Sequence, residues 1–208
     1  SNRLPHCPIH RRRWCPAGLY PIASTIGQSD LRNIIICGDG GRDLSYLANS
    51  GTVIKFTGTG SGSIMNLREN RAVVIEHIQF VYTSSSFTGT CFDCATVINS
   101  GNGSMFNWVQ FYSPAGLLTA SRVWYLRNCV DITFDQCYVA HCVNGWVGLD
   151  DSDGSQYETN VIRMINCTSI QLAGHAVVNP YTGWSMFACN FELGAGGIPS
   201  GITNTASK

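Results

Sequence analysis

The sequence predicts an all-β protein built as a parallel β-solenoid of about six coils. Three observations predict this fold: a strand motif that recurs along the chain, intervals of 24 to 31 residues between the copies, and the lack of a long amphipathic helical pattern. Short strands repeated at such intervals are typical of coils that stack about 4.8 Å apart. We assign the solenoid to residues 14–197, between an irregular N-terminal segment, 1–13, and a C-terminal tail, 198–208.

The N-terminal segment reads SNRLPHCPIHRRRW, and its consecutive arginines and scattered prolines do not resemble a regular element. We interpret it as a truncated or mistranslated start, which sequencing the source DNA in all frames can test. Three further signals follow in order: PAGLYPIASTI at 16–26, IIICGDGG at 34–41 and GTVIKFTG at 51–58.

The repeated motif is a seven-residue strand with an amide at its sixth position. Its copies are VIEHIQF (74–80), MFNWVQF (105–111), DITFDQC (131–137), VIRMINC (161–167) and SMFACNF (185–191). The amides are Gln79, Gln110, Gln136, Asn166 and Asn190. A lone buried amide is costly, whereas amides on successive coils can hydrogen-bond to one another. We therefore expect one buried amide ladder, and we expect Cys137 to stack on Cys167 without a disulfide.

Alternation along each strand predicts which side chains face the core. The positions four and two before the amide are predicted to point inward. They are Ile75, Phe106, Ile132, Ile162 and Met186, then His77, Trp108, Phe134, Met164 and Ala188. The position between them is predicted to face mostly outward, and reads Glu76, Asn107, Thr133, Arg163 and Phe187. A looser match of GWVGLD (145–150) to GHAVVN (174–179) predicts Trp146 over His175 and Asp150 over Asn179.

Glycine-rich or polar joints between the strands are predicted to be protruding turns. They are SSSFTG at 84–89, NSGNGS at 99–104, LDDSDGSQ at 149–156 and PYTG at 180–183. The final stretch, LGAGGIPSGITNTASK, loses the periodicity, so we expect a frayed tail or the start of a further segment there.

The composition argues against several classes of partner. Thirteen basic and thirteen acidic side chains cancel, and only Lys55 and Lys208 are lysines. No broad positive field is therefore expected to attract nucleic acid or anionic lipid. The longest apolar runs are far below the roughly 20 residues that a membrane span requires, and we find no pattern of a cleaved leader.

The ten cysteines do not have the spacing of a small disulfide-stapled domain, and most lie inside apolar strand patterns. We interpret most of them as buried thiols. Cys91 and Cys94 have the spacing of half a zinc site, but no second pair completes it, so no metal site is predicted there.

Together, the three N-terminal signals and the amide motif resemble the right-handed parallel β-helix of the pectate lyase-like superfamily, especially phage tailspikes. The resemblance covers about residues 14–197. It implies a polysaccharide-binding and polysaccharide-degrading protein, a glycoside hydrolase or lyase like a tailspike depolymerase, located outside the cell or on a virion. A non-catalytic adhesin or structural virion part is the alternative, because this fold hosts both. The resemblance also implies a homotrimer or a capping domain. We expect no cofactor, with calcium as the alternative.

If the chain acts on polysaccharides, hydrolysis needs two carboxyl groups at roughly 5 to 10 Å from each other. Asp150 and Asp151 are the predicted pair, with His175 near them on the next coil, and Asp153 and Glu158 are candidates for substrate contacts. Ordinary turn chemistry, in which such side chains bond their own backbone, is the more common explanation of a cluster of this kind. The cluster also loosely resembles a calcium loop, but it lacks the ligand spacing and terminal Glu of an EF-hand.

Asp135 is a further candidate, because our alignment places it in a column otherwise filled by Ile78, Val109, Ile165 and Cys189. Arg163 on the next coil is predicted either to form an ion pair with Asp135 or to contact substrate. As the basic residue that β-elimination would need, Arg163 is also the lyase candidate. We favour hydrolysis, since no calcium-binding array of aspartates accompanies it.

Three aromatic residues, Trp146, Tyr181 and Trp184, are predicted to stack against sugar rings on a second face. The alternative for each is packing against a neighbouring subunit. His141 and His175 are either proton carriers or partly buried hydrogen-bonding residues.

Overall fold

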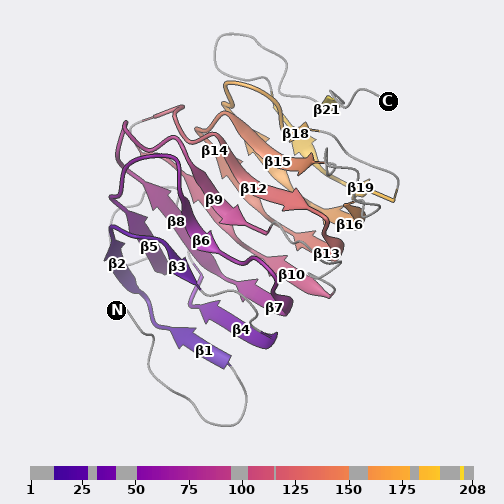
Figure 1. Cartoon of the computed structure of the whole chain (residues 1–208), viewed down its shortest axis with the longest axis horizontal. Helices are drawn as coiled ribbons and strands as arrows, with labels where there is room; N and C mark the ends of the chain where they lie inside the picture. The colour runs from indigo at the N-terminus through magenta and orange to yellow at the C-terminus, as the bar shows by residue number, and fades with distance from the viewer. Residues whose placement is uncertain are drawn as a thin grey trace.

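In the computed structural model the chain is a right-handed parallel β-helix, as predicted (Figure 1). The residues that the structure describes are 12–27, 32–40, 51–94, 103–114, 116–149, 159–178, 183–192 and 202–203. They form three sheets of seven strands, and every strand pairs in parallel with its neighbours. Successive strands of the chain visit the three sheets in turn, so each coil contributes one strand to each sheet.

We name the sheets A, B and C in the order in which a coil visits them. Sheet A contains β1 (Arg12–Cys15), β4 (Arg32–Gly38), β7 (Arg71–Glu76), β10 (Ser104–Asn107), β13 (Val130–Asp135), β16 (Asn160–Ile165) and β19 (Ser185–Phe187). Sheet B contains β2 (Gly18–Ile22), β5 (Thr52–Phe56), β8 (Ile78–Tyr82), β11 (Gln110–Tyr112), β14 (Tyr138–Ala140), β17 (Thr168–Ile170) and β20 (Asn190–Phe191). Sheet C contains β3 (Ile26–Gly27), β6 (Ser63–Asn66), β9 (Thr90–Asp93), β12 (Arg122–Arg127), β15 (Asn144–Leu149), β18 (Val177–Val178) and β21 (Ile202–Thr203).

The described strands thus form seven coils, one more than the estimate from the sequence. In Figure 1 the colour runs along the stack, from indigo strands at the N-terminal end to yellow strands at the C-terminal end. The last strand of sheet C, β21, pairs with β18 although it falls in the segment predicted to be a tail. An open sheet edge offers unpaired backbone groups, so even a short segment without a hydrophobic pattern can add to it.

Aromatic side chains from sheets A and C fill the middle of the cylinder. Trp124 of β12 stacks on Phe92 of β9 below it and on Trp146 of β15 above it, with ring centroids 5.3 and 5.0 Å away. Phe106 of β10 stacks on Phe134 of β13 in the same way, at 5.1 Å. All five side chains are at most 1% exposed. Like residues therefore lie over like residues, as coil stacking requires.

The turn from sheet A to sheet B is made in five coils by a single residue in the left-handed region. These corner residues are His77, Trp108, Gln136, Asn166 and Ala188, with φ between 51° and 58°. A residue in this conformation interrupts the alternation of inward and outward side chains. Ile75, two residues before His77, and Ile78, one residue after it, are therefore both buried. We refer to this position as the A/B corner.

The predicted amide ladder is wrong, because the motif copies at 131–137 and 161–167 were aligned two residues out of register. Backbone pairing places Gln79, Gln110, Tyr138, Thr168 and Asn190 in one column of sheet B. Gln136 and Asn166 lie instead at the A/B corner and are exposed. Asparagine tolerates the left-handed conformation better than most residues, which gives Asn166 a reason to be there without burial.

The correct inward column of sheet A follows from the same pairing. It contains Ile36, Ile75, Phe106, Phe134, Met164 and Met186. The predicted columns that placed Ile132 and Ile162 beside Ile75, and His77 beside Phe134, are therefore wrong. Ile132 and Ile162 are nevertheless buried, because they occupy the next inward position along the same strands.

The cysteine prediction is confirmed for the described cysteines. Nine of them carry free thiols, and seven of these are buried. Cys137, Cys167 and Cys189 follow the A/B corner in successive coils. The Cys137 thiol donates to the carbonyl oxygen of Phe106 at 3.3 Å, and the Cys167 thiol donates to that of Phe134 at 3.5 Å. Burial raises the pKa of the Cys129 thiol to about 12, so this thiol is held in its unreactive neutral form.

Gly89 sits where two coils approach too closely for any side chain. A Cβ atom at this position would lie 1.8 Å from the carbonyl oxygen of Gly62 and 2.7 Å from the Phe87 ring. We expect Gly89→Ala to lower the free energy of unfolding by about 3 kcal/mol, because backbone must move to relieve the clash. Chemical denaturation followed by circular dichroism measures the change.

Gly62 provides the matched control. Its nearest neighbour for an added Cβ is the Thr25 hydroxyl oxygen at 3.9 Å, an ordinary contact. We expect Gly62→Ala to change the free energy of unfolding by less than about 1 kcal/mol. Equal effects of the two substitutions would contradict the close approach of the coils at Gly89.

Candidate functional site

The outer face of sheet A carries a column of polar side chains in the middle of the stack. The Cα atoms of Glu76 and Asn107 are register partners, and so are those of Asn107 and Asp135. Successive members therefore lie about 4.8 Å apart along the cylinder. We call these three residues the polar column. On either side of it, the same position is occupied by Cys37 before Glu76 and by Ile165 after Asp135.

Two oxygen atoms of the polar column are buried without a hydrogen-bond donor. The Asn107 Oδ1 and the Asp135 Oδ1 each expose less than 1 Å², and neither accepts a hydrogen bond within the described part of the chain. A shielded acceptor without a donor costs about 1–3 kcal/mol, more if it is charged. Both oxygen atoms therefore lie below the surface of the face, and a donor from a ligand would reach them only if the column rearranged.

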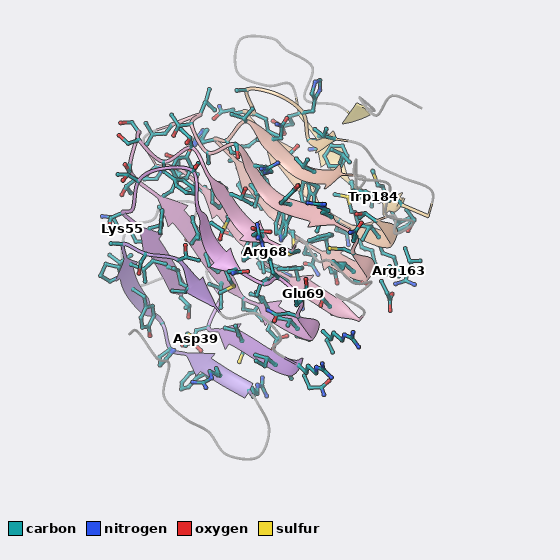
Figure 2. All side chains as sticks on the ribbon, viewed as in Figure 1. Asp39, Lys55, Arg68, Glu69, Arg163 and Trp184 are labelled. Atoms are coloured by element: carbon teal, nitrogen blue, oxygen red, sulfur yellow. The ribbon has the colours of Figure 1, made fainter. Side chains whose placement is uncertain are left out.

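Two arginines flank the polar column, and each forms an ion pair. Arg12 Nη2 lies 3.7 Å from Glu76 Oε1, and Arg163 Nη1 lies 2.5 Å from Asp131 Oδ1. The predicted pairing of Arg163 with Asp135 is wrong. Arg163 lies beside Thr133 in the register, and it reaches across to the left-handed Asp131 at the start of β13 instead. Figure 2 shows Arg163 near the C-terminal end of the stack.

Two rings stand at the A/B corner directly after the first two members of the polar column. The ring centroids of His77 and Trp108 are 6.1 Å apart, with 31° between their planes. Both residues are half-buried. The prediction that His77 belongs to the core is wrong, because the left-handed corner places it outside the inward column.

Trp146, predicted to stack against sugar, is a core residue with 0% exposure. That prediction is wrong, because the loose match between 145–150 and 174–179 was two residues out of register. The Cα partner of Trp146 is Val177, and His175 lies before the strand. The indole ring therefore packs inside the cylinder on Trp124 rather than on an outer face.

The remaining described candidates lie apart from the polar column. His175 precedes β18 of sheet C, and its backbone N–H donates to the Asn144 Oδ1 at 2.9 Å. Trp184 is half-buried beside the core, and its indole N–H donates to the carbonyl oxygen of Thr159 at 3.2 Å. His141 fits the predicted alternative of a hydrogen-bonding residue, since its Nδ1 lies 2.6 Å from the carbonyl oxygen of Ser113.

The other five candidate residues lie outside the described residues. They are Asp150, Asp151, Asp153, Glu158 and Tyr181. The predicted carboxylate pair and the loose calcium-loop pattern therefore stay predictions.

Sequence reasoning missed Glu76, Asn107 and Trp108 as members of a site. The sequence does contain a signal for them. Ile78 and Val109 are the first inward residues after the corner, and Cys137 and Cys167 are the equivalent residues in the next two coils. Aligning the copies on these four residues places Asp135 in the column of Glu76 and Asn107. On that alignment Asp135 is one of three successive polar residues rather than an isolated exception.

Among the described residues, no three His, Cys, Asp or Glu side chains are grouped closely enough to hold a metal ion. Cys91 and Cys94, which have the spacing of half a zinc site, are buried free thiols. No helix in this part of the chain is long and apolar enough to cross a membrane.

Comparisons of the chain with protein-family models, with curated proteins and with solved structures gave no match.

Proposed function

We propose that this β-helix binds a polysaccharide along the outer face of sheet A and hydrolyses it there. The observation that carries the proposal is the polar column, which combines two carboxyl groups and an amide beside the half-buried rings of His77 and Trp108. Sugars are recognised by this combination, since hydroxyl groups donate to acceptors and the apolar faces of sugar rings pack on aromatic rings.

The spacing of the two carboxyl groups supports hydrolysis. Glu76 and Asp135 lie two coils apart, so their backbones are separated by about 10 Å. Carboxyl groups about 6.5–9.5 Å apart leave room for a water molecule on the far side of the sugar, as in inverting glycosidases. Glu76 faces Arg12 of β1, on the side of β7 away from Asn107, so substrate binding would have to turn Glu76 toward Asn107 to bring the two groups into this range. Glu76 would then serve as the base, and Asp135 would serve as the acid.

A resemblance to the pectate lyase-like superfamily adds to the proposal. The parallel β-helix fold and the N-terminal signals at 16–26, 34–41 and 51–58 support it. The same resemblance supports a homotrimer acting outside the cell or on a virion. Sedimentation of the purified protein tests the trimer, and a monomer at all concentrations would contradict it. β-Elimination with Arg163 as base is the less supported chemistry, because Asp131 already engages that guanidinium.

Incubation with a panel of bacterial capsular and plant polysaccharides tests the function. We expect new reducing ends and no absorbance of unsaturated sugars. Unsaturated products would favour the lyase alternative. Binding without cleavage would favour the second candidate function, a non-catalytic adhesin or virion part. Neither binding nor cleavage of any polysaccharide would contradict the proposal.

A further inference from the structure

We infer that the outer face of sheet C holds an oxyanion-binding site, in which Arg122 binds a sulfate, phosphate or carboxylate group of a ligand. The site lies on a different sheet from the polar column, so it goes beyond the proposed function. It consists of outward residues of β9 and β12 together with Arg68, which follows β6 in the chain.

The outer face of sheet C is identified by the burial of residues along β12. Trp124 and Leu126 are 0% exposed and point into the cylinder, whereas Tyr125 between them is half-buried. The Cα partners of Tyr125 are Asp93 on one neighbouring coil and Val147 on the other. Because side chains alternate along a strand, Tyr125 and Asp93 lie side by side on the outer face.

The guanidinium group of Arg122 is held on this face by two contacts. Its Cζ lies 4.1 Å from the centroid of the Tyr125 ring, and its Nε donates to the Thr90 Oγ1 at 2.9 Å. Stacking on an aromatic ring and hydrogen bonding along one edge both fix the orientation of a guanidinium group. The group is therefore ordered before a ligand arrives, which lowers the entropy cost of binding.

The other edge of the same guanidinium group has unused donors. The two Nη atoms of Arg122 make no hydrogen bond with the described residues, and neither of them is buried. The N–H groups on this edge of a guanidinium match two oxygen atoms of a sulfate, phosphate or carboxylate group. An oxyanion can therefore bind here without breaking an ion pair or a hydrogen bond of the protein.

The charge around Arg122 also favours an anion. Arg68, in the middle of the view in Figure 2, donates to the Asp93 Oδ2 through its Nε and Nη2, each at 2.8 Å. The hydrogen bond to Asp93 is the main cause that raises the pKa of Arg68; Tyr125 raises this pKa further and Arg127 lowers it, so both lie nearby. The three arginines outnumber the Asp93 carboxylate, so the cluster carries a positive charge that attracts anions.

Titration with inorganic sulfate, inorganic phosphate and acetate tests the inference, with chloride at matched ionic strength as the baseline. Nuclear magnetic resonance of the full chain follows the backbone amide signals of Thr90 and Tyr125 and the Nε–H signal of Arg122. We expect at least one of the three anions to shift these signals to saturation. Binding of sulfate or phosphate alone would indicate a ligand with a tetrahedral group, and binding of acetate would indicate a carboxylate.

Arg122→Lys is the decisive variant, because it keeps the positive charge and removes the fork of donors. The amide signals of Thr90 and Tyr125 should then report binding at least about tenfold weaker, since a hydrogen bond to a charged group contributes at least that factor. Arg71→Lys is the matched control, an exposed arginine at the start of β7 in sheet A, and should leave the affinity unchanged.

Thr90→Val tests whether the orientation of the guanidinium group matters. It removes the acceptor of the Nε hydrogen bond and keeps the size of the side chain. We expect the anion to bind several times more weakly and the Arg122 Nε–H signal to be lost to exchange with water.

The outcomes are independent of the proposed function. No saturable shift with any of the three anions would overturn the inference, and so would equal affinities of Arg122→Lys and the unchanged protein. Neither result bears on hydrolysis at the polar column, because Glu76 and Asp135 lie on sheet A. Failure of the polysaccharide panel would in turn leave anion binding at Arg122 standing.

Discussion

Replacing Trp124 by alanine is expected to lower the free energy of unfolding by about 3–5 kcal/mol, the range for deleting a large buried aromatic side chain. The indole ring is fully buried. It stacks between Phe92 and Trp146 and meets the edges of the Phe106 and Phe134 rings. A cavity at this point would loosen three consecutive coils. Because domains are stable by only about 5–15 kcal/mol, the loss is a large fraction of the total.

Chemical denaturation followed by circular dichroism measures this loss without depending on tryptophan fluorescence. Trp124→Phe is the matched control, since it keeps a ring in the stack. It also removes the indole N–H, which is buried without an acceptor among the described residues. We therefore expect the phenylalanine variant to lose less than half as much stability as the alanine variant. A loss below about 1 kcal/mol for alanine would contradict a tightly packed aromatic core.

The second large effect concerns the two carboxyl groups of the polar column. If they carry the proposed hydrolysis, Glu76→Gln and Asp135→Asn should each lower kcat by a factor on the order of 10²–10⁴, the usual contribution of general acid–base catalysis. Both substitutions preserve the shape of the side chain and remove the ionisable group. The rate of appearance of reducing ends on the best substrate of the panel measures the effect.

Three controls make this result interpretable. Circular dichroism confirms that each variant is folded, and Thr168→Ala on sheet B should retain the rate of the unchanged protein. The double variant should lose little more than the worse single variant, because an acid and a base that act together are not additive. Full activity of either single variant would show that its carboxyl group takes no part in the reaction.

The fold was predictable because coil stacking leaves a repeat that does not depend on exact register. Strand motifs at intervals of 24 to 31 residues indicate a parallel solenoid even when two copies are misaligned. The stacking of Cys137 and Cys167 was predictable for the same reason. The two motif copies that contain these cysteines were misaligned by the same two residues, so the prediction that one cysteine stacks on the other was not affected.

The columns were harder to predict, because the A/B corner interrupts the alternation on which strand reasoning depends. Inward residues are two apart within a strand, but Ile75 and Ile78 are three apart across the left-handed His77. Extending a period of two through this corner moves side chains to the wrong face. That error placed Gln136 and Asn166 in the core and separated Asp135 from Asn107.

The contacts of the candidate site can be predicted only if the register between neighbouring strands is known to within one residue. The sequence patterns did not define the register with that precision. Arg163 was assigned to Asp135, four residues from its actual partner Asp131. Trp146 was assigned to an outer face by a match two residues out of register. Backbone hydrogen bonds determine which residues are partners on neighbouring coils. At polar positions these bonds do not restrict the residue type, so the sequence does not reveal the register there.

The corner between sheets A and B is a position at which the residue type can vary while the backbone conformation stays the same. Its backbone holds residues as different as His77, Trp108, Gln136 and Ala188 in one left-handed conformation. Glycine would adopt that conformation at lower cost, but it would bring no side chain. The protein thus gives up some stability to display one outward group at a fixed geometry in each of these five coils. Mutation at this position can alter the chemistry of the surface while the scaffold beneath it stays the same.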